Sequence, residues 1–305
     1  MRIGLSPPLP GSGSVDDVVA LVRQTADDGF ATFWMAQVFG LDALTALAIA
    51  GREVTGIELG TAVVPTYPRH PWVMAQQALT TQAAIGNRLA LGIGLSHQVV
   101  IEGMWGLSFA KPVRHLREYL EVLVPLSEGA TVEVQGETVT ARGALDVHGA
   151  APFPVLVAAL GPQMLDVAGR LADGTITWCV GPKTLAGFTI PTISHAAEHA
   201  GRAVPRVVAM FPVGVTADPA GVQERLGRSL TMYGQLPSYR AMLDREGADG
   251  AAELAILGSE QEVADRIAHL KDIGVTDLGA VPVRSTPDEA TQTKELLRRL
   301  GAALA

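Results

Sequence analysis

Short apolar runs alternate with longer amphipathic stretches along most of the chain. The short runs show little of the polar alternation that marks a strand with one wet face, so they predict strands that are buried on both faces. These runs are Arg2–Ser6, Thr32–Ala36, Glu58–Val64, Leu89–Gly94, Val155–Ala158, Gly174–Trp178, Val207–Val215 and Asp277–Val281.

The stretches between the runs have the spacing of helices that are apolar on one side. Three prolines support this interpretation, because Pro71, Pro112 and Pro162 stand where a first helical turn tolerates a missing N–H group. The predicted helices are Val15–Asp28, Leu41–Arg52, Pro71–Ile85, Pro112–Ser127, Pro162–Leu171, Lys183–Ala200, Ala220–Gly234, Ser259–Ile273 and Thr286–Leu300.

The succession of strand-then-helix units predicts an α/β fold, a (β/α)8 TIM barrel that forms a single domain over residues 1–305. One segment breaks the alternation. Residues 131–140, with Gln135 and Gly136 at their centre, predict a β-hairpin insertion. The chemistry of such barrels lies at the carboxyl ends of the strands, so site residues are expected just after each predicted strand.

Composition narrows the classes of function. The formal net charge is −8 and no basic stripe stands out, which argues against nucleic-acid binding, because that needs clustered Lys and Arg. The single cysteine, Cys179, allows neither a disulfide nor a Cys-based zinc site within the chain. No leader-like segment and no uninterrupted apolar stretch of about 18 residues is visible, so we expect a cytoplasmic protein without a membrane span.

Three stretches resemble the luciferase-like monooxygenase family, and in particular its F420-dependent branch. Gly60–Pro71 is similar to the family's third strand and the turn after it, and Arg88–Gly94 is similar to its fourth strand. Gly161–Gly174 resembles its Gly-Pro-x-Met…Ala-Asp-Gly block. The resemblance covers at least residues 1–180 and implies coenzyme F420 as the cofactor, a small-molecule substrate and a homodimer.

The resemblance also implies where the cofactor binds. A non-prolyl cis peptide bond, expected between Ala62 and Val63, would form a bulge behind the deazaflavin ring. The helix that begins at Gly161 would hold the cofactor phosphate, in agreement with the preference of helix N-termini for anions. The expected cofactor-binding residues are Ala62, Val63, Val64, Gly94, Ser96, His97, Gly161, Pro162, Gln163, Met164, Thr177 and Trp178.

The expected chemistry is hydride transfer between F420 and a small organic substrate, in which the cofactor does the hard chemistry. His97 is the best candidate for proton transfer, because histidine titrates near neutral pH. The segment after the second strand contains Gln37 and Phe39 and lacks the acid and the histidine that relatives often have there. Gln37 is the second catalytic candidate, and Phe39, Tyr67 and Trp178 are expected to border the substrate pocket.

Three other functions are consistent with the sequence. An FMN-dependent monooxygenase of the same family would use reduced FMN and oxygen, and a flavin- or deazaflavin-binding protein without catalysis would explain the missing acid and histidine. His195 to His199 match the H-x-x-E-H pattern of zinc proteases. Because that segment is predicted to lie on a helix outside the barrel, no metal site is expected.

His70 precedes Pro71 and is expected to have a structural role.

Overall fold

Eight parallel strands close into a barrel, as the sequence predicts. The structure, a computed structural model, describes residues 1–9 and 13–304. In the order in which they pair, the barrel strands are β1 (Arg2–Leu5), β2 (Thr32–Met35), β3 (Glu58–Thr61), β5 (Leu89–Gly94), β8 (Val155–Val157), β9 (Gly174–Trp178), β10 (Arg206–Val215) and β12 (Asp277–Pro282).

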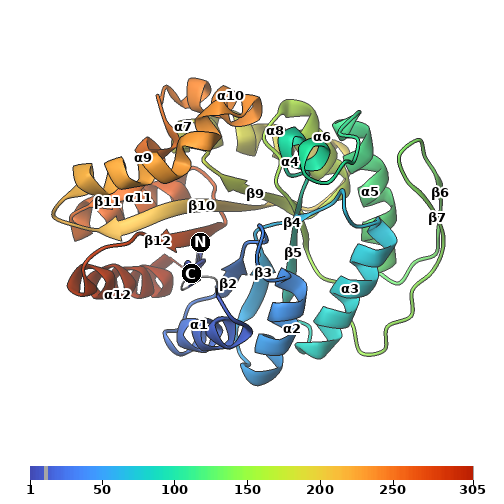
Figure 1. Ribbon diagram of the computed structural model, residues 1–305, viewed down its shortest axis with the longest axis horizontal. Coiled ribbons are helices and arrows are strands. Elements are labelled where there is room, and N and C mark those ends of the chain that lie inside the picture. Colours follow the sequence, from blue (N-terminus) through green and yellow to red (C-terminus); the bar gives the residue numbers. More distant parts are fainter. Residues whose placement is uncertain (10–12, 305) are drawn as a thin grey trace.

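The last strand closes the barrel on the first. β12 pairs with β1 so that Asp277 lies opposite Arg2, and the two ends of the chain lie side by side (Figure 1). The amino group of Met1 donates a hydrogen bond to the carbonyl of Leu304. Two short strands complete the sheet: β4 (Val64–Pro65) pairs with β5, and β11 (Ile256–Gly258) pairs with the end of β10.

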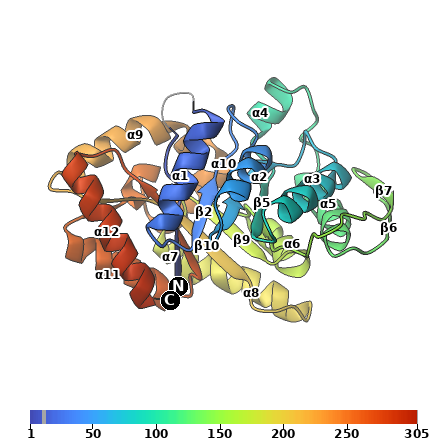
Figure 2. The ribbon, with the colours of Figure 1, turned by 90° about the horizontal axis from the view of Figure 1, so that it is seen from below.

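Helices cover the outside of the barrel, and α12, α1 and α2 follow one another around it (Figure 2). None of the helices in the described part of the chain is long and apolar enough to cross a bilayer. The helices are α1 (Val15–Asp27), α2 (Ala43–Glu53), α3 (Pro71–Ala84), α4 (Gln98–Gly103), α5 (Pro112–Ser127), α6 (Pro162–Leu171), α7 (Pro182–Thr184), α8 (Ile190–His199), α9 (Pro219–Gln235), α10 (Pro237–Glu246), α11 (Glu260–Asp272) and α12 (Pro287–Leu304).

The helix starts follow the capping rules. Ser14 and Ser259 each form a capping box, in which the serine hydroxyl accepts from a backbone N–H and an acid three residues later returns the bond. Pro71, Pro112 and Pro162 stand in the first turns of α3, α5 and α6, as predicted.

Large side chains from alternate strand positions fill the barrel interior. The interior cluster consists of Trp34, Ala90, Leu156, Ile176, Val208 and Met210. Trp34 is almost fully buried, and a Cβ atom at Gly60 would lie 2.2 Å from its ring. The glycine in β3 therefore makes room for the indole, and the barrel is a packed core rather than a pore.

An ion-pair network closes the amino-terminal end of the barrel. Arg206, at the start of β10, binds Asp277 at 2.6 Å and Glu58 at 2.7 Å. Arg2 also binds Glu58, at 3.0 Å, and Thr32 Oγ1 donates to the same carboxylate. These ion pairs support stability rather than chemistry, because the chemistry of a TIM barrel lies at the opposite end.

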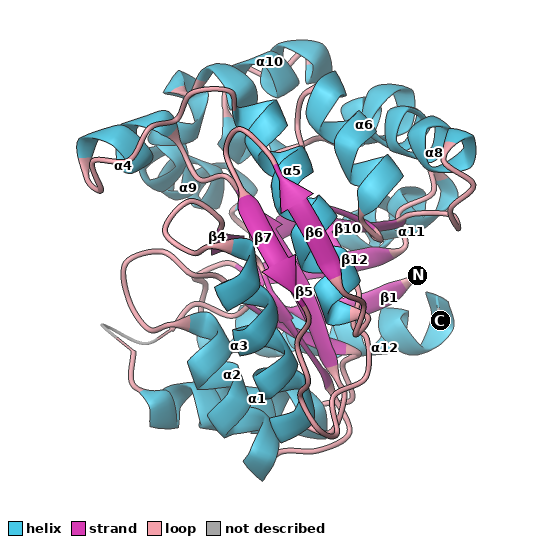
Figure 3. Cartoon of the chain, turned by 90° about the vertical axis from the view of Figure 1, so that its right-hand side faces the viewer, coloured by secondary structure: helices cyan, strands magenta, loops and turns pink. Residues whose placement is uncertain are grey.

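The hairpin insertion is present, with strands β6 (Val132–Gln135) and β7 (Thr140–Gly143), and it lies against α5 (Figure 3). The prediction was wrong in one detail, because residues 136–139 form the turn and the second strand continues to Gly143. The cause is Glu118 of α5, whose carboxylate accepts hydrogen bonds from the N–H groups of residues 137, 138 and 139. A partner outside the hairpin thus sets its register.

Other element boundaries also differ from the prediction. The helix predicted over Lys183–Ala200 is divided into α7, a π-helical turn (Leu185–Thr189) and α8. The strand predicted over Glu58–Val64 is interrupted between β3 and β4. The prediction missed α4, α10, β11 and a 3-10 helix (Ala251–Leu254), all of them short elements with little periodicity of their own.

Candidate active site

The carboxyl ends of the strands form one mouth of the barrel, and a backbone bulge lies in the wall of this mouth, between β3 and β4. The peptide bond between Ala62 and Val63 is cis, as predicted. β5 passes close beside it. A Cβ atom at Gly94 would lie 2.7 Å from Val63 Cγ2 and 3.3 Å from Ala158 Cβ, so only a glycine fits between the bulge and β8.

This bulge presents small apolar side chains to the mouth. Ala62 and Val63 are half-buried and Ala158 is exposed, although all three continue barrel strands. Val64 differs, because its side chain is fully buried and packs with the helix-facing core. Of the three predicted wall residues, Ala62 and Val63 can offer side chains to a ring, and Val64 can offer only its backbone.

The start of α6 can hold an anion. Gly161 is the N-cap residue, no side chain caps the helix, and an added Cβ at Gly161 would meet nothing within 4 Å. Pro162 and Gln163 are exposed in the first turn, while Met164 packs against the core. The free N–H groups of this turn and the helix dipole favour a phosphate, so these residues fit the phosphate end of the expected cofactor.

Thr177 and Trp178 end β9 on opposite faces. Trp178 packs against the barrel interior, so by the alternation of the strand Thr177 faces the helix layer. Thr177 Oγ1 is buried and has no hydrogen-bond partner among the described atoms. A buried hydroxyl without a partner is uncommon and marks a position where a bound group can supply one.

Four rings connect Trp178 with His97 across the mouth. Trp178 meets Tyr233 of α9 with centroids 6.3 Å apart, and Tyr233 meets Tyr239 of α10 at 4.9 Å. The Tyr239 ring in turn lies 5.8 Å from His97, edge to face. We call these four residues the tyrosine wall. Edge-to-face contacts of this kind orient the rings as well as bury them.

His97 is the N-cap residue of α4, but its side chain makes no capping hydrogen bond. Burial lowers its pKa below the ordinary value of 6.5, so the imidazole is neutral at pH 7. Ser96, just before it, has a left-handed backbone with φ of 58°. The turn therefore directs the His97 ring toward Tyr239 and leaves its ring nitrogens free of the helix.

Tyr67, just after β4, stacks on two rings. Its centroid lies 4.1 Å from that of His115, with the planes 11° apart, and 5.2 Å from that of Phe109. His115 Nε2 lies 3.1 Å from Thr66 Oγ1. We call Phe109, Tyr67 and His115 the tyrosine stack. Burial lowers the pKa of His115 to about 4, so its ring is neutral.

The predicted residues after β2 lie at the edge of the mouth. Gln37 Oε1 accepts a hydrogen bond from the backbone N–H of Ala43 at 3.0 Å, and so caps α2. Phe39 is 67 % exposed. Gln37 therefore has its amide NH2 group free toward a ligand, and Phe39 belongs to the rim rather than to a closed pocket.

The remaining histidines have structural surroundings. His70 is the N-cap of α3, where Nδ1 accepts from the N–H of Trp72 and Nε2 lies 3.1 Å from the Thr140 carbonyl, as expected for a structural role. His195 and His199 stack with centroids 3.9 Å apart on α8. A zinc site needs three protein ligands or more, and the described residues offer no group of three.

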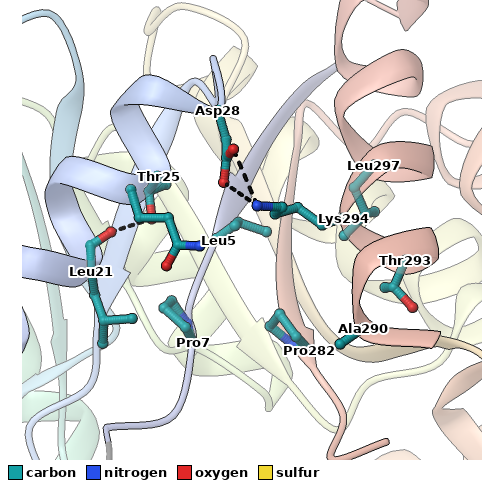
Figure 4. Close-up of a pocket in the computed structure, with 11 residues that line it drawn as sticks. Leu5, Pro7, Leu21, Thr25, Asp28, Pro282, Ala290, Thr293, Lys294 and Leu297 are labelled. Carbon is teal, nitrogen blue, oxygen red and sulfur yellow. Dashed lines mark hydrogen bonds and ion pairs between the residues drawn. The ribbon is translucent and has the colours of Figure 1, made fainter. Parts of the chain in front are cut away.

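Two hollows lie elsewhere, in the helix layer. One, of about 150 Å³, separates α1 from α12, and Figure 4 shows Asp28 and Lys294 pointing toward each other across it, 3.1 Å apart. The other, of about 240 Å³, is bordered by Phe211 of β10 and by α11. Neither includes a predicted site residue, so the mouth is the better candidate for chemistry.

Sequence reasoning missed Tyr233, Tyr239, Phe109 and His115. Tyr233 and Tyr239 lie in α9 and α10, more than fifty residues after Trp178, and no local pattern connects them with it. Phe109 has no periodic context, and His115 stands inside a well-predicted helix, where a core position is its ordinary interpretation. Only the closure of the barrel brings these residues to the mouth.

The chain is similar to known proteins in sequence and in fold. A family model described as luciferase-like monooxygenase matches residues 3–277. A protein of Mycobacterium tuberculosis, provisionally named a coenzyme F420-dependent oxidoreductase, is 31% identical over 202 residues, which are 62% of this chain and 58% of that protein. The match thus spans less than two thirds of that relative.

Two longer matches cover nearly the whole chain. The 5,10-methylenetetrahydromethanopterin reductase of Methanolobus tindarius is 25% identical over 298 residues, 88% of this chain and 91% of that one. The structure of the coenzyme F420-dependent tetrahydromethanopterin reductase of Methanopyrus kandleri superposes with a TM-score of 0.80 at 24% identity, over 98% of this chain and 97% of that one. This structural likeness extends over all eight strands of the barrel.

Proposed function

The chain belongs to the luciferase-like monooxygenase family, and from this premise we propose that it is an F420-dependent oxidoreductase that transfers a hydride between the deazaflavin and a small organic substrate. The observation that carries the proposal is the apolar wall of Ala62 and Val63, with Gly94 beside it, together with the uncapped helix start at Gly161. A flat ring with a phosphate tail fits this combination of an apolar wall and an anion site. The F420-dependent names of two relatives favour F420 over FMN.

F420, when bound, supplies a ring carbon that accepts or donates a hydride. The residues of the chain bind it and manage the proton. The N–H groups of the first turn of α6 hold the phosphate, and Ala62 and Val63 support the ring. The neutral imidazole of His97 accepts a proton from a substrate hydroxyl, or returns it in the reverse direction, and the amide NH2 group of Gln37 assists in orienting the substrate.

A parallel titration with F420 and FMN, followed by cofactor fluorescence, tests the cofactor. We expect F420 to bind with a dissociation constant of about 1 μM or below, and FMN to bind at least about tenfold more weakly, a difference of about 1.4 kcal/mol. The reverse preference would favour the FMN-dependent monooxygenase. Binding of neither would remove the basis of the proposal, and F420 binding without any hydride exchange would favour a binding protein without catalysis.

Placing a carboxylate at the start of α6 tests the phosphate site. Gly161→Asp is expected to weaken F420 binding by about tenfold or more, because a negative charge within a few ångströms of a phosphate costs at least about 1.4 kcal/mol. Gly250→Asp is the matched control, since Gly250 is also an N-cap residue with nothing within 4 Å of an added Cβ. Equal F420 affinity of both variants would exclude the helix start as the phosphate site.

A further inference from the structure

Aromatic rings wall the mouth on two sides. In the tyrosine wall, Tyr233 and Tyr239 link Trp178 to His97, and the tyrosine stack contains Tyr67, which follows the Ala62–Val63 bulge closely in the sequence. Several large apolar side chains on the neighbouring loops and helices are also exposed, namely Val38, Phe39, Val99, Met104, Leu107 and Met232. Apolar groups gathered around a mouth favour a ligand with an apolar body.

The charged groups of the mouth mostly have partners within the protein. Arg69 pairs with Asp42, and Lys111 and Arg114 both pair with Glu137. The carboxylate of Glu102 accepts hydrogen bonds from the side chain of Gln98 and from the N–H of Phe109. A substrate that carried a phosphate or carboxylate would find no preformed buried cation among these groups.

Two further cations follow barrel strands without an ion pair in the described part of the chain. They are Lys183, after β9, and Arg284, after β12, and both are exposed. An exposed cation is well solvated and screened by salt, so its attraction for an anion is small. These two cations favour the competing possibility, an anionic substrate, and a comparison of neutral with carboxylated probes distinguishes it from an uncharged substrate.

Besides Thr177 Oγ1, a second polar group near these rings lacks a hydrogen-bond partner among the described atoms. The Tyr67 hydroxyl is buried and makes no hydrogen bond to any described atom. Burial, together with the nearby Glu102 carboxylate, raises the pKa of Tyr67 to about 12, so the hydroxyl keeps its proton and can donate it in a hydrogen bond. A buried donor without an acceptor costs free energy, and a ligand oxygen would relieve that cost.

The segment that contacts the Tyr67 ring has few buried contacts of its own. Phe109, which stacks on Tyr67, is tied by its N–H to Glu102 at the end of α4. Within α4 only Ile101 is buried, so few contacts hold this helix in place. An element with so few buried contacts opens at low cost, and opening it gives a ligand access to the hydroxyl.

We propose that the substrate is an uncharged, mainly apolar molecule with one carbonyl or hydroxyl oxygen, and that the Tyr67 hydroxyl hydrogen-bonds this oxygen. The inference rests on the proposed function, because it takes the mouth as the place of hydride transfer with F420 as the redox partner. In the reducing direction the carbonyl carbon gains a hydride and its oxygen gains a proton, which gives the alcohol. In the oxidising direction the alcohol loses both.

Calorimetric titration of the protein loaded with oxidised F420 tests the substrate class. The probes are cyclohexanone and 1-tetralone, each beside a ring-carboxylated counterpart of nearly the same size. Oxidised F420 cannot reduce a ketone, so the readout is binding alone. We expect at least one neutral ketone to bind about tenfold more tightly than its carboxylated counterpart, because the mouth offers no buried cation to offset the desolvation of the carboxylate.

Tyr67→Phe tests the anchor. It is expected to weaken ketone binding by about 5- to 30-fold, which corresponds to the loss of about one to two kcal/mol of hydrogen bonding, and to leave F420 affinity unchanged. Its stability should be equal or higher, because the lost hydroxyl had no partner. Tyr119→Phe is the matched control: its hydroxyl donates to the Arg69 carbonyl at 3.0 Å, so ketone affinity should change by less than about twofold.

The outcomes distinguish a failure of the proposed function from a failure of the inferred substrate class. Failure of F420 to bind contradicts the proposed function itself. If F420 binds, equal or tighter binding of the carboxylated probes overturns the uncharged substrate and implicates Lys183 and Arg284. Absence of binding by all four probes to the F420-loaded protein also overturns the inference, and an unchanged ketone affinity in Tyr67→Phe overturns the role of Tyr67.

Discussion

Arg206→Ala is expected to lower the free energy of unfolding by about 3–5 kcal/mol, the usual cost of removing one partner from a buried ion pair. The guanidinium makes paired contacts with both Asp277 and Glu58, and its side chain is only 16 % exposed. It also lies over the Trp34 ring, 5.5 Å from the centroid. Alanine would leave two carboxylates close together beneath the barrel without this cation.

Urea unfolding followed by circular dichroism measures this loss. Arg142→Ala is the matched control, because its ion pair with Glu133 is about 70 % exposed on both sides, and removing such a pair changes stability by about 0–1 kcal/mol. Equal losses in the two variants would show that the network contributes no more than a surface pair. F420 affinity of the folded Arg206→Ala protein should be unchanged, since the network lies at the opposite end from the mouth.

The same network predicts how stability depends on pH. Burial alone would raise the pKa of Glu58, but the hydrogen bonds and charges of Arg206 and Arg2 outweigh it, and the net pKa is lowered. A carboxyl whose pKa is lower in the folded state contributes stability that is present above its unfolded pKa of about 4.3 and is lost as the pH falls through the folded pKa. Glu58→Gln should therefore flatten the acid limb of the stability curve.

His97→Ala is expected to lower the turnover number by about 10²–10⁴-fold with a neutral ketone or alcohol substrate, the usual contribution of a positioned acid or base. The cofactor does not replace this group, because the proton on the substrate oxygen must still be moved. F420 affinity is expected to stay within about tenfold of the parent, since we propose that the phosphate binds at the α6 helix start and not at His97.

Steady-state kinetics with F420 absorbance as the readout measures the effect. His148→Ala is the matched control, because His148 is exposed on the loop after the hairpin and its loss should leave turnover unchanged. Full turnover in His97→Ala would remove the proposed role of His97. Equal losses in F420 affinity and in turnover would assign His97 to cofactor binding instead.

The pH dependence of turnover tests which protonation state of His97 the reaction needs. The pKa of His97 is lowered by burial, so the neutral form predominates from below pH 6.5 upward. Substrate oxidation, which needs the neutral imidazole to accept a proton, should increase with pH through an acid limb below 6.5 and then stay level to pH 8. This acid limb should be absent from whatever activity His97→Ala retains.

Local patterns in the sequence were sufficient for most of the fold and for two backbone features of the candidate site. Buried strands, first-turn prolines and capping serines are set by neighbours within a few residues, so the barrel strands and most helices could be placed from the chain alone. The bulge at Ala62–Val63 and the helix start at Gly161 follow from short segments that resemble the family. Their residues lie close together in the sequence, and their backbone conformation is local.

Contacts between distant segments were decided only by the tertiary structure. Tyr239 contacts His97 and Tyr233 contacts Trp178 because α9 and α10 fold back over the mouth. No periodic pattern in the sequence predicts these contacts. Arg206 reaches Glu58 across 148 positions of sequence, because the closed barrel brings the starts of β3 and β10 together. The sequence by itself determined the eight barrel strands and most of the long helices, since these depend on local propensity and burial. The closure of the barrel decided which side chains face one another, because that depends on the packing of the whole chain.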